Sequence, residues 1–278
     1  MKTISIKITT KNFESDNEIL LALLSDLNFE GFLEDHNFLI GYLKENEFEN
    51  FKLFFETIKN NFDDLTYTTE IIEEKNWNEL WEKNFDPVII SNTVLIKAPF
   101  HQIDKKYKYE ITIFPRMAFG TGHHPTTAMM IELMLKYHDR IINKKVVDIG
   151  CGTGILAIMA SKLGAQDIVA IDISSYAIEN TTENAKLNNI NNINCYESSI
   201  EFLNFEKFDI ILANLTKNLI LEQINYYYNL LSYNGLIFLS GILSIDINEI
   251  INKMTKYNFK FLEKSEKKEW CGIVFLKN

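Results

Sequence analysis

The sequence predicts a doubly wound α/β domain with a mainly parallel sheet, preceded by a small α+β domain. Two observations carry this prediction. Residues 1–75 show the element order β-α-β-β-α-β, which is the ferredoxin-like pattern. From residue 125 onward, helical and strand patterns alternate, as expected for a Rossmann-like sheet with helices on both faces.

The chain has 278 residues, of which 46% are hydrophobic, so it is long enough for one large domain or two modest ones. No apolar run approaches the roughly 18–20 residues that span a bilayer. Residues 1–7 alternate polar and apolar side chains and lack the continuous apolar core of a signal peptide. Three cysteines, an odd number, argue against a disulfide scaffold. We therefore expect a soluble, cytoplasmic protein.

The charge is acidic and unevenly distributed. The chain carries 28 Lys+Arg against 38 Asp+Glu, a net charge of -10. Residues 1–75 alone hold seven lysines and sixteen acidic residues, so the remainder is nearly neutral. A duplex nucleic-acid binder normally needs a basic face, so this balance weighs against that class of protein.

Hydrophobic periodicity assigns the elements of the first domain in order. We expect a helix capped by Ser15-Asp16, running to about Leu27 with Ile19 among its inward residues. A second amphipathic helix follows a hairpin signal at Asp35-His36-Asn37. The expected strands are 3–9, 31–34, 38–43 and 65–72, and the second helix covers 48–60.

A helix over 76–85 carries Trp77 and Trp81 and stops before Pro87, so we assign 76–86 as a connector and 87–278 as the second domain. The expected strands of that domain are 88–90, 94–97, 109–114, 145–149, 168–171, 208–213 and 236–239, with helices at 126–137, 155–163, 176–187 and 219–231. Segments 259–263 and 273–276 would close one edge of the sheet.

The most informative motif is DIGCGTGI over 148–155, where a buried strand turns directly into a helix. Gly150 and Gly152 suit a sharp turn that lets a ligand approach bare backbone. Asp172 ends the next strand, where a carboxylate can accept both hydroxyls of a ribose. The combination indicates a nucleoside ligand, although a tight turn that binds nothing is the alternative.

The type of nucleoside follows from what the turn lacks. No Lys follows the glycines, so the turn is not a P-loop, and the third glycine comes one place too early for a dinucleotide fingerprint. S-adenosylmethionine has a ribose, an adenine, a cationic sulfonium and an amino-acid tail, but no phosphate. It fits this turn better than a nucleotide does.

A second motif, MAFGTGHHPTT over 117–127, precedes the first helix of the α/β series. Thr126 and Thr127 can cap that helix and offer hydroxyl and N–H groups to the carboxylate of such a tail, or they can be capping residues only. His123 and His124 are adjacent and have no thiol or carboxylate cluster beside them, so we expect no metal site.

A third motif, IILANLT over 210–216, ends a predicted buried strand. Ligands of open α/β sheets sit at the carboxyl ends of strands, so Asn214 is a candidate to accept hydrogen bonds from an incoming amine. An ordinary turn asparagine is the alternative. Cys151 is expected to be a packing residue, because no general base accompanies it.

Taken together, the three motifs resemble the class I S-adenosylmethionine methyltransferases. More narrowly, segments 118–127, 148–158 and 213–215, together with SGIL over 240–243, are similar to the PrmA family of ribosomal protein L11 methyltransferases. The likeness covers 76–278 well, whereas over 1–75 it rests on length and element order. Arg116 departs from the family, which usually has Gly before Met-Ala-Phe-Gly.

The resemblance implies that 1–75 recognises a substrate protein and that 87–278 is catalytic. It implies methyl transfer to lysine side chains and the N-terminal amine of ribosomal protein L11, with Thr127, Gly150, Asp172 and Asn214 at the cofactor. The acidic surface of 1–75 would then attract a basic ribosomal protein. Two alternatives stay open: an RNA N-methyltransferase and a non-catalytic cofactor sensor. Neither a nucleic-acid partner nor a membrane is implied, and the oligomeric state is not predicted.

Overall fold

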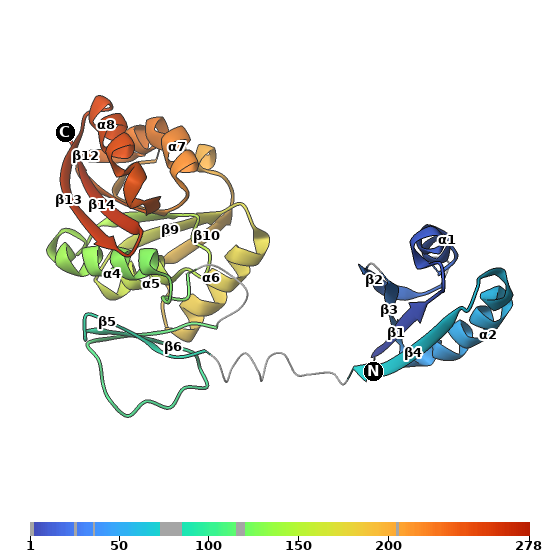
Figure 1. Ribbon diagram of the computed structural model, residues 1–278. Coiled ribbons are helices and arrows are strands. Elements are labelled where there is room, and N and C mark those ends of the chain that lie inside the picture. The colour runs from blue at the N-terminus through green and yellow to red at the C-terminus, as the bar shows by residue number, and fades with distance from the viewer. Residues whose placement is uncertain (1–2, 25–26, 36, 73–84, 115–119, 204–205) are drawn as a thin grey trace. The chain divides into compact units, whose positions relative to one another are not determined.

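The computed structural model describes residues 3–24, 27–35, 37–72, 85–114, 120–203 and 206–278. The chain divides into two compact units, Met1–Asn84 and Phe85–Asn278 (Figure 1). The expected connector helix, with Trp77 and Trp81, lies outside the described residues. Phe85, which we had placed in that connector, is buried in the core of the second unit.

In its described residues, the first unit is a four-stranded antiparallel sheet in the order β2-β3-β1-β4, accompanied by two helices. This is the strand order of the ferredoxin-like pattern, and it confirms the predicted small α+β domain. The inner face of the sheet packs on the helices around Ile6, Leu39 and Phe51. The elements are β1 Thr3–Thr9, α1 Phe13–Leu24, β2 Phe29–Asp35, β3 Phe38–Lys44, α2 Phe48–Ile58 and β4 Thr66–Ile72.

Helix α1 differs from its prediction at the start. It begins at Phe13, two residues before the expected cap, because the carbonyl of Asn12 already accepts hydrogen bonds from the backbone N–H groups of Ser15 and Asp16. Ile19, expected to face inward, is 56% exposed. The start of the helix was misplaced because Ser and Asp are favourable both at a cap and within the first turn.

The second unit contains a seven-stranded sheet in the order β10-β9-β8-β11-β12-β14-β13. The first five strands of this order are parallel, whereas β14 runs antiparallel to both β12 and β13. The predicted α/β class is thereby confirmed as a mixed, mainly parallel sheet. The strands are β8 Lys145–Ile149, β9 Asp167–Asp172, β10 Ile193–Glu197, β11 Phe208–Asn214, β12 Leu231–Leu243, β13 Phe259–Lys267 and β14 Trp270–Lys277.

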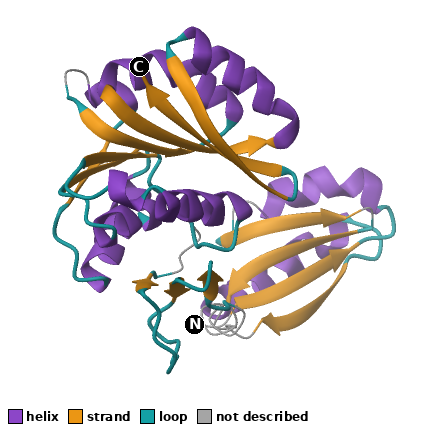
Figure 2. Cartoon of the chain, turned by 90° about the vertical axis from the view of Figure 1, so that its left-hand side faces the viewer, coloured by secondary structure: helices purple, strands orange, loops and turns teal. Residues whose placement is uncertain are grey.

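Helices cover both faces of this sheet, as the doubly wound prediction requires (Figure 2). Helices α4, α5 and α6 pack on one face, and α7 and α8 pack on the other. The helices are α4 Pro125–Lys136, α5 Ile155–Lys162, α6 Ser175–Leu187, α7 Lys217–Leu230 and α8 Ile247–Lys256. A small separate sheet joins β5 Val88–Ile90, β6 Val94–Lys97 and β7 Tyr109–Thr112.

Two elements of the second unit had not been assigned from the sequence. Strand β10 is an edge strand whose side chains are exposed or half-buried, so it shows no apolar run. Helix α8 buries Ile247, Ile250 and Met254, whose spacing of three and four residues is typical of one face of a helix.

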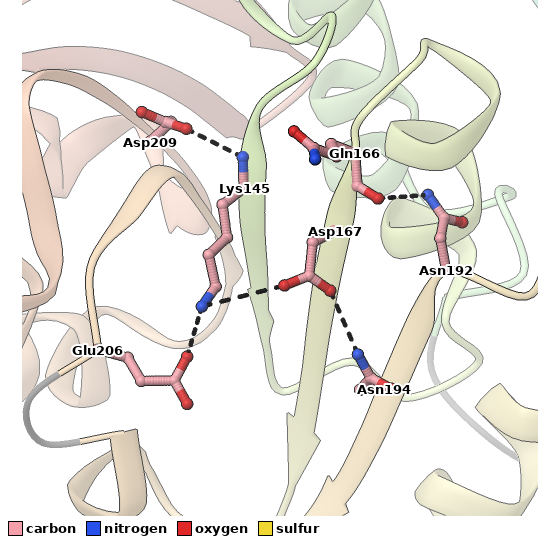
Figure 3. A network of polar contacts seen from close by, with 7 residues as sticks. All are labelled: Lys145, Gln166, Asp167, Asn192, Asn194, Glu206 and Asp209. Carbon is pink, nitrogen blue, oxygen red and sulfur yellow. Dashed lines mark hydrogen bonds and ion pairs between the residues drawn. The ribbon is translucent and has the colours of Figure 1, made fainter.

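The amino-terminal edge of the parallel strands is fixed by polar contacts (Figure 3). The backbone N–H of Lys145 donates to Asp209, and its side chain pairs with Glu206 at 2.8 Å. Asp167, at the start of β9, accepts from the Asn194 amide at 3.2 Å. These contacts join the starts of neighbouring strands. The glycine turn lies at the opposite edge of the sheet, at the carboxyl end of β8.

Asp148 links β8 to the helix that follows the glycine turn. Its carboxylate is buried and accepts from the backbone N–H of Ala157 at 3.0 Å, in the first turn of α5. Burial raises the pKa of Asp148 to about 7; the bond from Ala157 opposes this shift, and the nearby charge of Asp172 adds to it. An acceptor at this position satisfies an N–H group that the helix itself leaves free.

No helix in the described part of the chain is long and apolar enough to cross a bilayer. Within the same residues, no group of three or more His, Cys, Asp or Glu side chains gathers into a metal-binding cluster. All three cysteines are free thiols.

The raised pKa of Asp148 predicts a specific pH dependence of stability. Its folded pKa lies above the ordinary 3.8, so the folded state binds the proton more tightly and this contribution to stability is lost as the pH rises toward about 7. Asp148→Asn removes the titration. Between pH 3.8 and about 7, the free energy of unfolding of the natural protein, relative to that of this variant, should fall by up to about 1.4 kcal/mol per pH unit. Urea unfolding at several pH values measures it, and a pH-independent difference would contradict a buried, titrating carboxyl.

Candidate functional site

A cavity of about 600 Å³ opens at the carboxyl ends of β8, β9 and β11, where the order of strands reverses. Its walls come from seven segments that are far apart in the sequence. They include His124, Thr126, Gly150, Gly152, Asp172, Ile173, Ser198, Glu201, Asn214, Leu215, Gln223, Gly241 and Trp270. A cavity of this size suits a small-molecule cofactor.

The glycine turn forms the floor of this cavity. The backbone N–H groups of Gly150 and Cys151 both donate to the carbonyl of Ile171, at 2.9 and 3.0 Å, which ties the turn to the end of β9. Gly150 has a φ of 72°, and a Cβ there would lie 2.6 Å from the Leu215 side chain. The positive φ favours glycine at this position, and a larger residue would also displace the end of the Leu215 side chain.

Asp172 is held in a defined orientation by the backbone. One carboxylate oxygen accepts from the N–H of Gly152 at 3.1 Å, and the other accepts from the N–H of Ser174 at 3.1 Å. Each oxygen keeps a lone pair for a further donor. A half-buried carboxylate with two oxygens fixed in this way suits a pair of vicinal hydroxyls.

Asn214 contributes an acceptor that the protein itself does not use. Its amide nitrogen donates to the hydroxyl of Thr127 at 3.5 Å, and its amide oxygen is buried without a hydrogen-bond partner among the described residues. A buried acceptor without a partner is costly, so a ligand donor reaching it would be bound favourably.

Thr127 does not line the cavity. It is fully buried behind Asn214, whereas its neighbour Thr126 lies in the wall. The motif therefore supplies one threonine to the cavity and one to the support of Asn214. Which of the two threonines faces the cavity depends on how α4 is rotated about its axis, and the sequence alone does not give that rotation.

The segment after β11 is also held by a close backbone contact. The N–H of Leu215 donates to the carbonyl of Ser240 at 3.0 Å, where β12 has an irregular register. The adjacent Gly241 has a φ of 87°, and a Cβ on it would overlap the carbonyl of Leu215. This contact sets the position of the backbone that carries Asn214.

The two adjacent histidines have different surroundings. His124 caps α4: its Nδ1 accepts from the backbone N–H of Thr126 and lies 2.7 Å from the Thr126 hydroxyl. Its ring packs against Trp270, 4.9 Å between centroids. His123 turns elsewhere, with Nε2 at 2.9 Å from the carbonyl of Asp86 and its ring against Phe85. Only His124 belongs to the cavity wall.

The composition of the wall tests whether S-adenosylmethionine fits. Among the described residues that line the cavity, none is Lys or Arg, the side chains that usually neutralise a phosphate. Asp172 and Glu201 give it acidic character instead. A cationic cofactor without phosphate fits this wall, and the unpartnered oxygen of Asn214 leaves an acceptor beside it.

Comparison with known proteins gives the family. A family model described as "Ribosomal protein L11 methyltransferase (PrmA)" matches residues 3–278. The chain belongs to the PrmA family. It is 36% identical over 283 residues to the ribosomal protein L11 methyltransferase of Phocaeicola vulgatus, covering 99% of each chain. It is 40% identical over 211 residues to that of Porphyromonas gingivalis, covering 75% of this chain and 72% of the relative.

A solved structure of a PrmA relative supports the fold. The crystal structure of the ribosomal protein L11 methylase from Lactobacillus delbrueckii subsp. bulgaricus aligns with a TM-score of 0.63 at 29% identity. The alignment covers 70% of this chain and 100% of the other. The family resemblance found from the motifs is thereby confirmed.

Sequence reasoning missed several residues of this PrmA cavity. Trp270 begins β14 and is brought beside His124 only by the sheet. Ile173 lies one residue beyond Asp172, and Gln223 is two turns into α7. No motif marks these positions; only the rule that strand ends converge could have suggested Ile173.

Arg116, the departure from the PrmA pattern, lies outside the described residues. Cys151 is buried and its pKa is raised by burial, in keeping with a packing role.

The contact between Gly241 and Leu215 yields a prediction. In Gly241→Ala the added methyl group displaces the Leu215 backbone, and Asn214 with it, so turnover should fall about 100-fold, as expected for a reacting group misplaced by about 1 Å. Gly31→Ala is the control, because a Cβ at Gly31 meets nothing within 4 Å. Steady-state methyl transfer measures both variants. Equal turnover for Gly241→Ala and the natural protein would show that this contact does not position Asn214.

Proposed function

We propose that this protein transfers methyl groups from S-adenosylmethionine to amino groups of ribosomal protein L11, both lysine side chains and the N-terminal amine, in the cytoplasm. The observation that carries the proposal is the PrmA match over 3–278, which spans both units. The carboxylate of Asp172 and the unused acceptor of Asn214 on one cavity support it.

The proposed cofactor contacts follow from the wall of the cavity. Asp172 accepts hydrogen bonds from the ribose hydroxyls, while Gly150 and Gly152 present bare backbone to the cofactor. The start of α4 attracts the carboxylate of the amino-acid tail, since the N-terminus of a helix favours an anion. Thr127 supports Asn214 from behind.

When bound, the cofactor supplies a methyl group already activated by a positively charged sulfur. The contribution of the protein is then mainly positioning, which is worth several orders of magnitude in rate. Asn214 accepts a hydrogen bond from an N–H of the incoming amine and so orients the nitrogen lone pair. The apolar walls formed by Leu215 and Trp270 exclude water from the same place.

The amine must lose a proton before it reacts. Neutralising a lysine of pKa about 10.4 at pH 7 costs roughly 4–5 kcal/mol, and desolvation reduces this cost. His124 is a poor acceptor for that proton, because its Nδ1 already accepts from Thr126 and a neutral ring then carries its proton on Nε2. His123 is not among the residues that line the cavity, and its ring lies against Phe85. We propose that the proton leaves to water.

The two units have separate proposed roles. Residues 1–75 recognise the substrate protein, 76–86 connect the units, and 87–278 carry out the chemistry. The acidic surplus of 1–75, sixteen acidic residues against seven lysines, supports attraction of a basic ribosomal protein.

Separate substitutions of Asn214 and Asp172 distinguish orientation from binding. Asn214→Ala should lower turnover about 100-fold with little change in cofactor affinity, because its acceptor acts on the amine. Asp172→Asn should instead weaken cofactor binding about 10- to 100-fold, because it loses two charge-assisted hydrogen bonds. Asp167→Asn is the matched control: it lies at the other end of β9, in the network of Figure 3. Undiminished turnover of Asn214→Ala would contradict the orienting role.

The proposed loss of the proton to water predicts that His124 does not control the pH dependence. His124→Asn keeps a side-chain acceptor at the cap of α4. Its profile of turnover against pH should keep the shape seen for the natural protein, within about threefold in rate. Loss of an acid limb in the variant would instead make His124 the proton acceptor.

The acceptor is tested with labelled S-adenosylmethionine, undermethylated ribosomal protein L11 and ribosomal RNA. Mass spectrometry should find L11 heavier by multiples of one methyl group, at lysines and the N-terminus, with no label in RNA. Label in RNA alone would favour the RNA N-methyltransferase, and cofactor binding without any transfer would favour a sensor.

A further inference from the structure

Thr153 occupies the middle of the glycine turn but does not line the cavity. It is fully buried and hydrogen-bonded through two different groups. Its hydroxyl donates to the carbonyl of Gly120 at 2.6 Å. Its own carbonyl accepts from the side-chain amide of Asn184 at 2.9 Å.

Asn184 in α6 extends this connection to the end of β7. Its amide oxygen accepts from the backbone N–H of Phe114 at 2.7 Å, and its amide nitrogen also donates to Asn180 at 3.0 Å. One turn later, Asn188 exchanges hydrogen bonds with both the N–H and the carbonyl of Thr112, at 2.9 and 2.6 Å. Asn184 is completely buried.

Phe114 and Gly120 are therefore both tied to Thr153, Phe114 through Asn184 and Gly120 directly. Gly120 leads through Gly122 to His124, which caps α4, and to Thr126 in its first turn, and both line the cavity. Thr153 lies between Gly152 and Gly154 on the opposite side of the same site. Both polar atoms of the Asn184 side chain have partners, whereas the amide nitrogen of Asn180 has none among the described residues. The paired amide of Asn184 fixes one arrangement of the segments that it joins.

We propose that Thr153 and Asn184 are positioning residues, which set the segment 120–127 against the glycine turn and thereby hold the cofactor-binding groups at their distance. This inference rests on the proposed function, in that it takes the cavity to bind S-adenosylmethionine. Neither residue touches the cofactor; each acts through Gly120, Thr126 and the turn.

Thr153→Val tests the proposal with almost no change in volume. It removes the hydrogen bond to Gly120, and we expect the affinity for S-adenosylhomocysteine, measured by calorimetry, to fall about tenfold. Thr153→Ser keeps the hydroxyl and should bind within about twofold of the natural protein. Asn184→Leu removes the other half of the connection and should weaken binding at least as much.

Asn192→Leu is the matched control for a merely structural effect. Asn192 also carries a part-buried amide, which donates to the carbonyl of Ala165 at 2.9 Å and accepts from Ser161 at 2.7 Å, away from the cavity lining. Asn192→Leu should lower the free energy of unfolding without changing the affinity for S-adenosylhomocysteine. Hydrogen exchange of the Phe114 amide provides a second readout, faster in Asn184→Leu and unchanged in Asn192→Leu.

The outcomes separate this inference from the proposed function. If Asn184→Leu does not fold, the comparison of Thr153→Val with Thr153→Ser decides. Wild-type affinity in folded Thr153→Val would overturn the inference, as would weakening in Asn192→Leu equal to that in Asn184→Leu. Failure of the natural protein to bind S-adenosylhomocysteine would instead overturn the proposed function.

Discussion

The order of strands reverses at β8, so β9 pairs on one side of it and β11 on the other. The chains that leave β8 and β11 cover opposite faces of the sheet, and a crevice is left where they part. Asp172 and Asn214 reach this crevice edge because each ends one of these strands, whereas Asp148, one residue before the end of β8, is buried and outside the cavity lining. The packing of both hydrophobic cores fixes this sheet, and the sheet in turn fixes the site.

Two glycines allow Leu215 to pack closely beside this crevice, Gly150 against its side chain and Gly241 against its backbone. The polar groups around the crevice are bound before any ligand arrives: Asp172 by two N–H groups, and Asn214 by Thr127. A site held in this way loses little free energy on ordering when a cofactor binds. Among the described residues that line it, the amide oxygen of Asn214 is a buried acceptor without a protein partner.

Short motifs made the fold and much of the site predictable, since a strand, a glycine turn and the next strand end are close in sequence. The places of Gly150, Asp172 and Asn214 follow from such local patterns. Trp270 does not, because its contact with His124 depends on the antiparallel pairing of β14. The sequence did not show which of Thr126 and Thr127 lines the cavity, because packing sets the rotation of a helix about its axis. Strand β10 was missed because an edge strand needs no apolar run.

The most direct test of this account is a crystal structure with S-adenosylhomocysteine bound. Both ribose hydroxyls should lie within hydrogen-bonding distance of the Asp172 carboxylate, and the tail carboxylate should lie at the start of α4. The amide oxygen of Asn214 should lie beside the sulfur with no protein partner. A ribose placed away from Asp172, or an Asn214 amide oxygen taken up by another side chain, would contradict this account.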